Sequence, residues 1–218
     1  MKKQILFGSI LMIAAIAVYL VFAQFNRKTL YEVMKVPDFQ LIDQNHQEIS
    51  NKSMLGKVYL VEFFFTNCPT ICPVMKQNIL SIEKEVNHSD FGVISITIDP
   101  KRDTPERLLE QRNQLKIENP NWHFLTGDRS YIYELSKEFN IYMGEVENSQ
   151  EGLNHSGKFA LVDKKGIIRC RYDEKGLPIL YYSGLNYTDP QGKVESLSGT
   201  YHPEVEWLKE DIQKLLNE

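Results

Sequence analysis

Residues 58–73 read VYLVEFFFTNCPTICP, and this stretch decides the fold of the 218-residue chain. Its first part, Val58–Phe65, is an apolar run typical of a buried strand. A helical pattern follows over residues 73–85. Cys68 and Cys72 therefore lie on a strand-to-helix turn, close to the N-terminus of a helix. We expect this position to lower the thiol pKa, because unpaired backbone N–H groups and the helix dipole favour a thiolate.

Cys68 and Cys72 are four residues apart, and on a helical path such positions share a face. Their sulfurs can then close a disulfide or bind one metal ion, so the pair indicates thiol redox chemistry, soft-metal binding, or both. A peroxiredoxin is excluded because no threonine lies three residues before either cysteine. A zinc hydrolase is excluded because the chain has no H-E-x-x-H motif or similar acidic base.

Strand and helix patterns alternate along the rest of the chain. Thr104 followed by Pro105 indicates a helix start, since threonine caps helices and proline suits the first helical position. This order implies an α/β sandwich with a parallel part and a terminal hairpin. The predicted strands are 36–42 and 47–49 (a hairpin), 58–65, 91–98, 122–125, 158–163 and 167–172, and the predicted helices are 73–85, 104–115, 128–139 and 203–216.

The N-terminal segment is predicted to be a membrane anchor. Residues 5–23 carry no charge, and as a helix they would span roughly 28 Å at about 1.5 Å per residue, which suits a bilayer core. A cleaved signal peptide is the alternative, but Val21-Phe22-Ala23 is a poor cleavage site because valine is bulky. We expect an anchor over residues 1–23, a linker over 24–35 and one soluble domain over 36–218.

The charges of the chain indicate where the protein is located in the cell and which partners are excluded. Lys2 and Lys3 favour a cytoplasmic N-terminus, and no Arg-rich transit peptide is present. The soluble domain is therefore expected on the periplasmic or external side of a bacterial inner membrane. The formal net charge of −4 and the lack of a basic stripe exclude nucleic acid as a partner. Three cysteines are too few for a disulfide scaffold, so a hydrophobic core must hold the domain together.

Four motifs occur in an order that resembles the Sco/SenC proteins, which are thioredoxin-like, membrane-anchored copper chaperones. They are FTNCPTICP (65–73), TIDPKRDTP (97–105), WHFLTG (122–127) and HSGKFALVD (155–163). The resemblance implies that Cys68, Cys72 and His155 bind one copper ion. It also implies delivery of that copper to the binuclear copper site of a cytochrome c oxidase subunit, with a thiol–disulfide reductant as a further partner.

The chemistry of these residues agrees with the resemblance. Thiolates are soft ligands that select Cu(I), and imidazole also suits copper. His155 lies in the loop entering the 158–163 strand, where thioredoxins carry a cis-proline, and residues 151–156 contain no proline. The alternative function is a thiol–disulfide oxidoreductase or redox sensor that uses the same two cysteines. Thiol exchange alone does not require His155, so this residue favours copper.

The remaining candidates are expected to be structural. Cys170 should pack as a small buried residue. Asp103 is expected to cap the helix that follows it. For Asp99 two interpretations stay open: a residue that only forms the turn, or a carboxylate that interacts with the copper site. The Tyr-rich residues 173–198 are expected to form an ordered insertion at the domain edge, before the last helix. The other four histidines, which are His46, His88, His123 and His202, are expected to be solvated.

Overall fold

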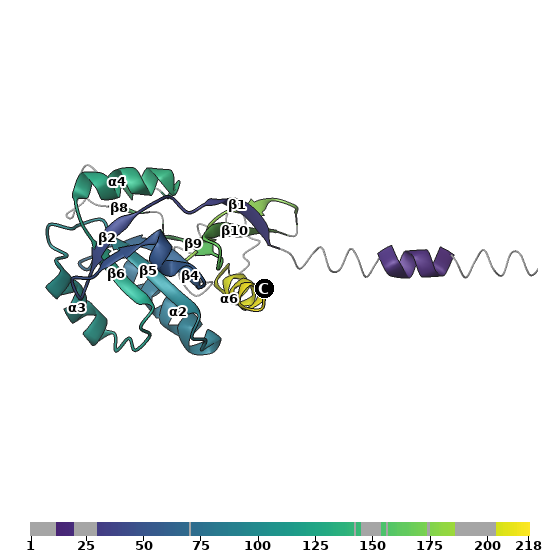
Figure 1. Ribbon diagram of the computed structural model, residues 1–218, viewed down its shortest axis with the longest axis horizontal. Coiled ribbons are helices and arrows are strands. Elements are labelled where there is room, and N and C mark those ends of the chain that lie inside the picture. Colours follow the sequence, from purple (N-terminus) through teal and green to yellow (C-terminus); the bar gives the residue numbers. More distant parts are fainter. Residues whose placement is uncertain are drawn as a thin grey trace, which may run out of the picture. The chain divides into compact units, whose positions relative to one another are not determined.

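The computed structural model describes residues 12–19, 30–69, 71–141, 143–144, 154–155, 157–173, 175–185 and 204–218. The chain divides into two compact units, Met1–Tyr31 and Glu32–Glu218. In the first unit residues 12–19 are helical. Among the described residues, no helix combines the length and the apolar character needed to cross a membrane. The second unit contains the sheet and all labelled helices (Figure 1).

The second unit is built around a ten-stranded mixed sheet. Its main path runs in the order β1-β10-β9-β4-β5-β6-β2-β3, with β11 paired to β10 and β12 paired to β9. The strands are β1 (Tyr31–Lys35), β2 (Gln40–Asp43), β3 (Glu48–Ser50), β4 (Val58–Phe64), β5 (Phe91–Thr97), β6 (Trp122–Thr126), β9 (Lys158–Val162), β10 (Ile167–Tyr172), β11 (Pro178–Ile179) and β12 (Tyr182–Ser183).

Strand β4 is the centre of this sheet. It runs parallel to β5, in register from Val58 opposite Phe91 to Phe64 opposite Thr97, and antiparallel to β9. All seven residues of β4 are buried, because helices cover both faces and an apolar run of this kind cannot face water without loss of stability. The parallel part and the hairpin β9–β10 are confirmed.

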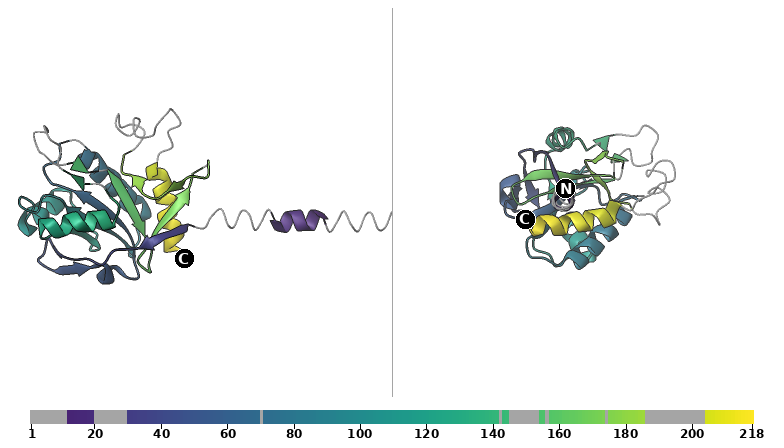
Figure 2. Two further views of the ribbon diagram at one scale, coloured as in Figure 1. Left: turned by 90° about the horizontal axis from the view of Figure 1, so that it is seen from above. Right: turned by 90° about the vertical axis from the view of Figure 1, so that its right-hand side faces the viewer.

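Helices cover both faces of the sheet. Figure 2 shows α2 (Ile71–Val86) and α6 (Glu204–Leu216) on one side and α4 (Arg129–Glu138) on the other. Successive side chains of β4 point to opposite faces of the sheet. The ring centroid of Phe63 lies 5.9 Å from that of Phe139 at the end of α4, and the ring centroid of Phe64 lies 5.5 Å from that of Phe124 in β6. The alternation of a strand thus fills two cores at once.

The helix α3 (Pro105–Gln114) begins as its sequence predicts. Thr104 is its N-cap and accepts a hydrogen bond from the backbone N–H of Arg107 at 3.4 Å, and proline occupies the first turn. The cap predicted for Asp103 is therefore wrong, because the neighbouring threonine takes that role. Asp103 has other partners, which are described below.

Two segments differ from the predicted domain organisation. Tyr31–Lys35 form strand β1, so part of the predicted linker belongs to the sheet.

The first part of the predicted insertion is also in the sheet, as β11 and β12. Tyr182 and Leu185 are buried there, and the Tyr182 hydroxyl donates to the buried Asp211 of α6 at 2.8 Å. The edge excursion is thus wrong for residues 182–185, which are buried between β9 and α6, while β11 lies at the edge of the sheet with Pro178 and Leu180 exposed. Residues 186–198 lie outside the described residues.

This packing predicts a measurable role for the Tyr182 hydroxyl. We expect Tyr182→Phe to lower the free energy of unfolding by about 1 kcal/mol or more, since it leaves the buried Asp211 carboxylate with one donor fewer. Chemical denaturation measures the change. Tyr133→Phe, on exposed α4, is the matched control and should shift stability by less than about 0.5 kcal/mol. Equal effects of the two substitutions would contradict the packing.

Candidate thiol and metal site

The site lies where several chain segments meet at one edge of the sheet. Strands β4 and β5 are parallel, so the loops after Phe64 and Thr97 leave the sheet at the same edge. Strand β9 is antiparallel to β4, so its first residue, Lys158, lies at that edge too. The cysteine turn, the loop before α3 and the chain just before β9 are thereby brought together.

The two cysteines are close neighbours in a buried turn. Phe65 and Cys68 close the turn with a backbone hydrogen bond of 3.4 Å, and Cys72 lies in the first turn of α2. Cys68 is 8% exposed and Cys72 is 1% exposed, and both are reduced thiols. The two thiols share a hydrogen bond. The predicted approach of the pair at the strand-to-helix turn is therefore confirmed.

The electrostatics of Cys72 differ from the sequence expectation. Its pKa is raised well above the ordinary range, first by the hydrogen bond with Cys68, then by burial and the negative charge of Cys68, and least by the negative charge of Glu62. A hydrogen bond from the backbone of Phe65 acts in the opposite direction but is outweighed. The expectation that the helix start lowers the thiol pKa is thus wrong for Cys72, because the hydrogen bond with Cys68 and burial raise its pKa more than the backbone hydrogen bond lowers it.

Glu62 is a buried carboxylate in the middle of β4. It is 1% exposed and accepts a hydrogen bond from the Ser95 hydroxyl at 2.7 Å, which in turn accepts from the indole of Trp122 at 3.0 Å. Sequence reasoning missed this residue. The available signal was a single charged residue within an otherwise apolar run, six positions before Cys68, since buried charges are rare without a specific role.

Asp103 connects the loop before α3 to the cysteine turn. Its carboxylate accepts hydrogen bonds from the backbone N–H and the hydroxyl of Thr66 and from the hydroxyl of Thr97. Asp99 instead pairs with the exposed Arg102 at 3.3 Å. The carboxylate that the sequence assigned to helix capping is the one that contacts the turn of the cysteines.

His155 lies in β8 (Asn154–His155), a short strand paired with β7 (Met143–Gly144). Its side chain lies outside the described residues. Two positions later, Gly157 has a φ of +65°, and a Cβ there would lie 3.2 Å from the Ile71 side chain, next to Cys72. The chain just after His155 therefore packs closely against the helix turn that carries the second cysteine.

The other histidines take structural positions. His46 is exposed and pairs with Glu106 at 2.9 Å, and His88 accepts the backbone N–H of Asp90. The prediction of a solvated His123 is wrong: its imidazole is 16% exposed and lies 3.1 Å from Asp43, because it faces the neighbouring strand β2. His202 lies outside the described residues. Cys170 is buried in β10 as predicted, and burial raises its pKa.

The described side chains alone do not form a metal site with three or more His, Cys, Asp or Glu groups. Two sulfurs are in place, and a third ligand would have to come from a side chain outside this set. Two adjacent thiols can lose their protons and bind one soft cation, or lose two protons and two electrons to an oxidant and form a disulfide.

The sequence comparison decides the family. The SCO1/SenC family model matches residues 28–185, which include the cysteine turn and β8. The chain belongs to the SCO1/SenC family. The resemblance drawn from the four motifs is thus confirmed.

Individual relatives and a solved structure agree with this assignment. A SCO2-like protein of Rickettsia prowazekii is 34% identical over 134 residues, and the match covers 59% of this chain but only 64% of the relative. A putative copper-binding protein of Stutzerimonas stutzeri is 30% identical over 139 residues, covering 62% of this chain and 67% of that protein. BsSco is a member of the Sco family of cytochrome c oxidase assembly proteins in which a disulfide switch has been identified. Its structure matches with a TM-score of 0.63 and 25% identity over 87% of this chain and 96% of that one. The mixed α/β sheet is therefore similar to the thioredoxin-like sheet of Sco proteins.

The raised pKa of Cys72 in this SCO1/SenC protein predicts how its reactivity depends on pH. In a Cys170→Ala background, Cys68→Ala should lower the Cys72 pKa more than Glu62→Gln does, because the hydrogen bond with Cys68 is the largest cause. A thiolate is the reactive species, so a lower pKa moves alkylation to lower pH. Iodoacetamide labelling of Cys72 against pH, read by mass spectrometry, measures the shift.

The control for this experiment is Glu83→Gln, which changes a half-buried carboxylate on the same helix that faces Asn119 instead of the thiols. Its labelling profile should match the parent protein. A Cys72 profile that stays unchanged after Cys68→Ala would contradict the hydrogen bond between the thiols.

Proposed function

We propose that this SCO1/SenC protein is a copper chaperone that binds one Cu(I) ion through Cys68, Cys72 and His155. The observation that carries the proposal is the buried pair of hydrogen-bonded thiols. Paired thiolates in a water-poor site suit a soft monovalent cation better than any hard ion. The close contact of Gly157 with Ile71 supports His155 as the third ligand, since it brings the chain next to the histidine against the cysteine turn.

The proposed recipient is the binuclear copper site of a cytochrome c oxidase subunit. Membership of the SCO1/SenC family and the oxidase-assembly role named for BsSco support this recipient. The similarity to a putative copper-binding protein supports copper as the cargo. A thiol–disulfide reductant is a further partner in this proposal, because only the reduced pair offers two thiolates to the metal.

Copper titration of the full-length protein tests the ligand set. Cys68→Ser and Cys72→Ser should abolish tight Cu(I) binding, because thiolates dominate affinity for a soft metal. His155→Ala should weaken binding by at least about tenfold, since even groups that only support a ligand have effects of this size. Competition with a chromophoric Cu(I) chelator, with the protein in detergent, gives the affinities.

His123→Ala is the matched control, because this imidazole is held by Asp43 beside β2. It should leave Cu(I) affinity unchanged. Equal losses from His155→Ala and His123→Ala would remove His155 from the ligand set.

A thiol–disulfide oxidoreductase is the second candidate function, and it is supported by the same pair of adjacent thiols. The two roles exclude each other at any instant, because a disulfide cannot supply two thiolates. Oxidised protein should therefore lose Cu(I) affinity and regain it on reduction. Undiminished copper uptake by a verified Cys68–Cys72 disulfide would leave the pair with redox chemistry alone.

We also propose that residues 1–23 anchor the protein in a bacterial inner membrane, with the domain on the periplasmic or external side. The charge-free run over residues 5–23 supports this location. After fractionation of bacteria expressing the full chain, the protein should stay with membranes in carbonate and be digested by protease added outside the inner membrane. A soluble mature protein that starts near Gln24 would instead show a cleaved signal peptide.

A further inference from the structure

The turn that carries Cys68 is held from one side by a single buried carboxylate. Asp103 is 1% exposed, and its Oδ2 accepts the backbone N–H of Thr66 at 3.0 Å and the hydroxyl of Thr97. Its Oδ1 accepts the hydroxyl of Thr66. Three hydrogen bonds to one buried carboxylate fix its orientation, and hydrogen bonds to a charged group are among the stronger ones in proteins.

Asp103 is itself fixed to the sheet. Its backbone N–H donates to the carbonyl of Asp99 at 2.9 Å, and the Thr97 hydroxyl that donates to its carboxylate also accepts the N–H of Asp99 at 3.0 Å. The next residue, Thr104, is the N-cap of α3. The carboxylate is therefore part of a closed loop between the end of β5 and the start of a helix.

Thr66 connects the Asp103 carboxylate to the turn that positions the two thiols. It is a central residue of the turn that Phe65 and Cys68 close. The backbone of Phe65 hydrogen-bonds the sulfur of Cys72, and Cys68 is the last residue of the turn. Holding Thr66 thus fixes both ends of the segment that sets the positions of the two sulfurs.

We propose that Asp103 is a positioning residue for the thiol pair, acting through Thr66. It does not touch the sulfurs. It holds the turn so that Cys68 and Cys72 face each other before metal or oxidant arrives, which removes an ordering cost from either reaction. The part of this proposal that concerns copper rests on the proposed function, while the part that concerns the disulfide does not.

Three substitutions separate hydrogen bonding from charge. Asp103→Ala removes every acceptor. Asp103→Asn removes the charge but can keep the contacts: its amide oxygen can accept from the Thr66 N–H and Thr97, and its NH₂ can donate to the Thr66 hydroxyl, which rotates. Thr66→Val keeps the backbone N–H and removes only the hydroxyl.

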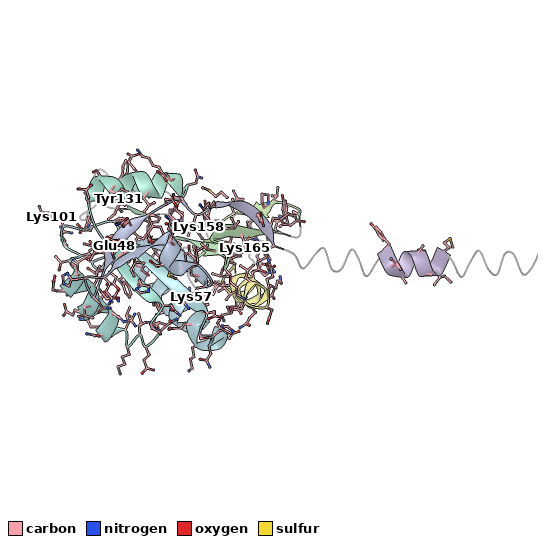
Figure 3. The ribbon with its side chains drawn as sticks, viewed as in Figure 1. Glu48, Lys57, Lys101, Tyr131, Lys158 and Lys165 are labelled. Carbon is pink, nitrogen blue, oxygen red and sulfur yellow. The ribbon has the colours of Figure 1, made fainter. Side chains whose placement is uncertain are left out.

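Asp163 offers a matched control in the same chain. It is also buried and accepts three hydrogen bonds, from the backbone of Lys165 and Ile167 and from Arg169. Its turn follows β9 at the opposite end of the sheet, beside the start of β4. Figure 3 shows Lys165 of this turn far from Lys101 of the Asp103 loop.

The experiment measures two equilibria on full-length protein in detergent. One is Cu(I) affinity against a chromophoric chelator. The other is metal-free: the Cys68–Cys72 disulfide reacts with two glutathione molecules to give the dithiol and one glutathione disulfide. Asp103→Ala should weaken Cu(I) binding by about tenfold or more, as loss of a group that orients a ligand typically does. It should make the disulfide easier to reduce by a similar factor, because a looser turn brings the sulfurs together less often.

Asp103→Asn should stay close to the parent protein in both measurements, and Thr66→Val should lie between it and Asp103→Ala. Asp163→Ala should lower the free energy of unfolding but leave both equilibria unchanged. Should Asp103→Ala fail to fold, Thr66→Val decides: unchanged copper and glutathione equilibria in that variant would overturn the proposal. Equal losses from Asp103→Asn and Asp103→Ala would also overturn it, as would losses in Asp163→Ala.

The two proposals fail in different ways. If the parent protein binds no Cu(I), the proposed function fails, and the glutathione equilibrium still tests Asp103. If the parent binds Cu(I) and folded Asp103→Ala matches it in both equilibria, only the positioning role fails.

Discussion

The burial of β4 on both faces and both edges is the constraint from which the site follows. The strand pairs with β5 on one side and β9 on the other, while helices cover it above and below. A strand enclosed in this way cannot shift its register without exposing apolar side chains or breaking two ladders. The point where the chain leaves the sheet after Phe64 is therefore fixed, and the cysteine turn starts there. The parallel neighbour delivers the Asp99–Asp103 loop to the same edge for the same reason.

Two buried carboxylates act on this turn in opposite ways. Glu62 adds its negative charge to the hydrogen bond with Cys68 and to burial, which together raise the pKa of Cys72. Asp103 accepts hydrogen bonds from the turn and holds it in place. A copper ion would offset the negative charge gathered beside the sulfurs, since a cation favours the thiolate that a carboxylate opposes. In the proposed function, the site is thus ordered before the metal binds and releases protons when it does.

Residues of the predicted insertion after β10 belong to the hydrophobic core. Tyr182 and Leu185 are fully buried, and the Asn78 side chain of α2 donates to the carbonyl of Gly184 at 2.7 Å. The N–H of Gly184 in turn donates to Gly157 at 2.8 Å. This chain of contacts links the cysteine-bearing helix, the short strand β12 and the residues that follow His155. Residues 182–185 are therefore part of the support of the site.

The sequence by itself determined the fold class and the long strands and helices, because apolar runs, alternation and caps such as Thr104 are local signals. It also predicted that Cys68 and Cys72 come together, since a strand-to-helix turn fixes their separation. Only the tertiary structure decided the pKa of Cys72, which depends on the hydrogen bond with Cys68, on the extent of burial and, least, on Glu62. It also paired Asp103 with Thr66, 37 residues away along the chain, and His123 with Asp43, 80 residues away. It placed Tyr182 in the core through a two-residue strand too short to give a periodic signal. Charge, burial and pairing at such distances arise from packing, and no local pattern in the sequence carries them.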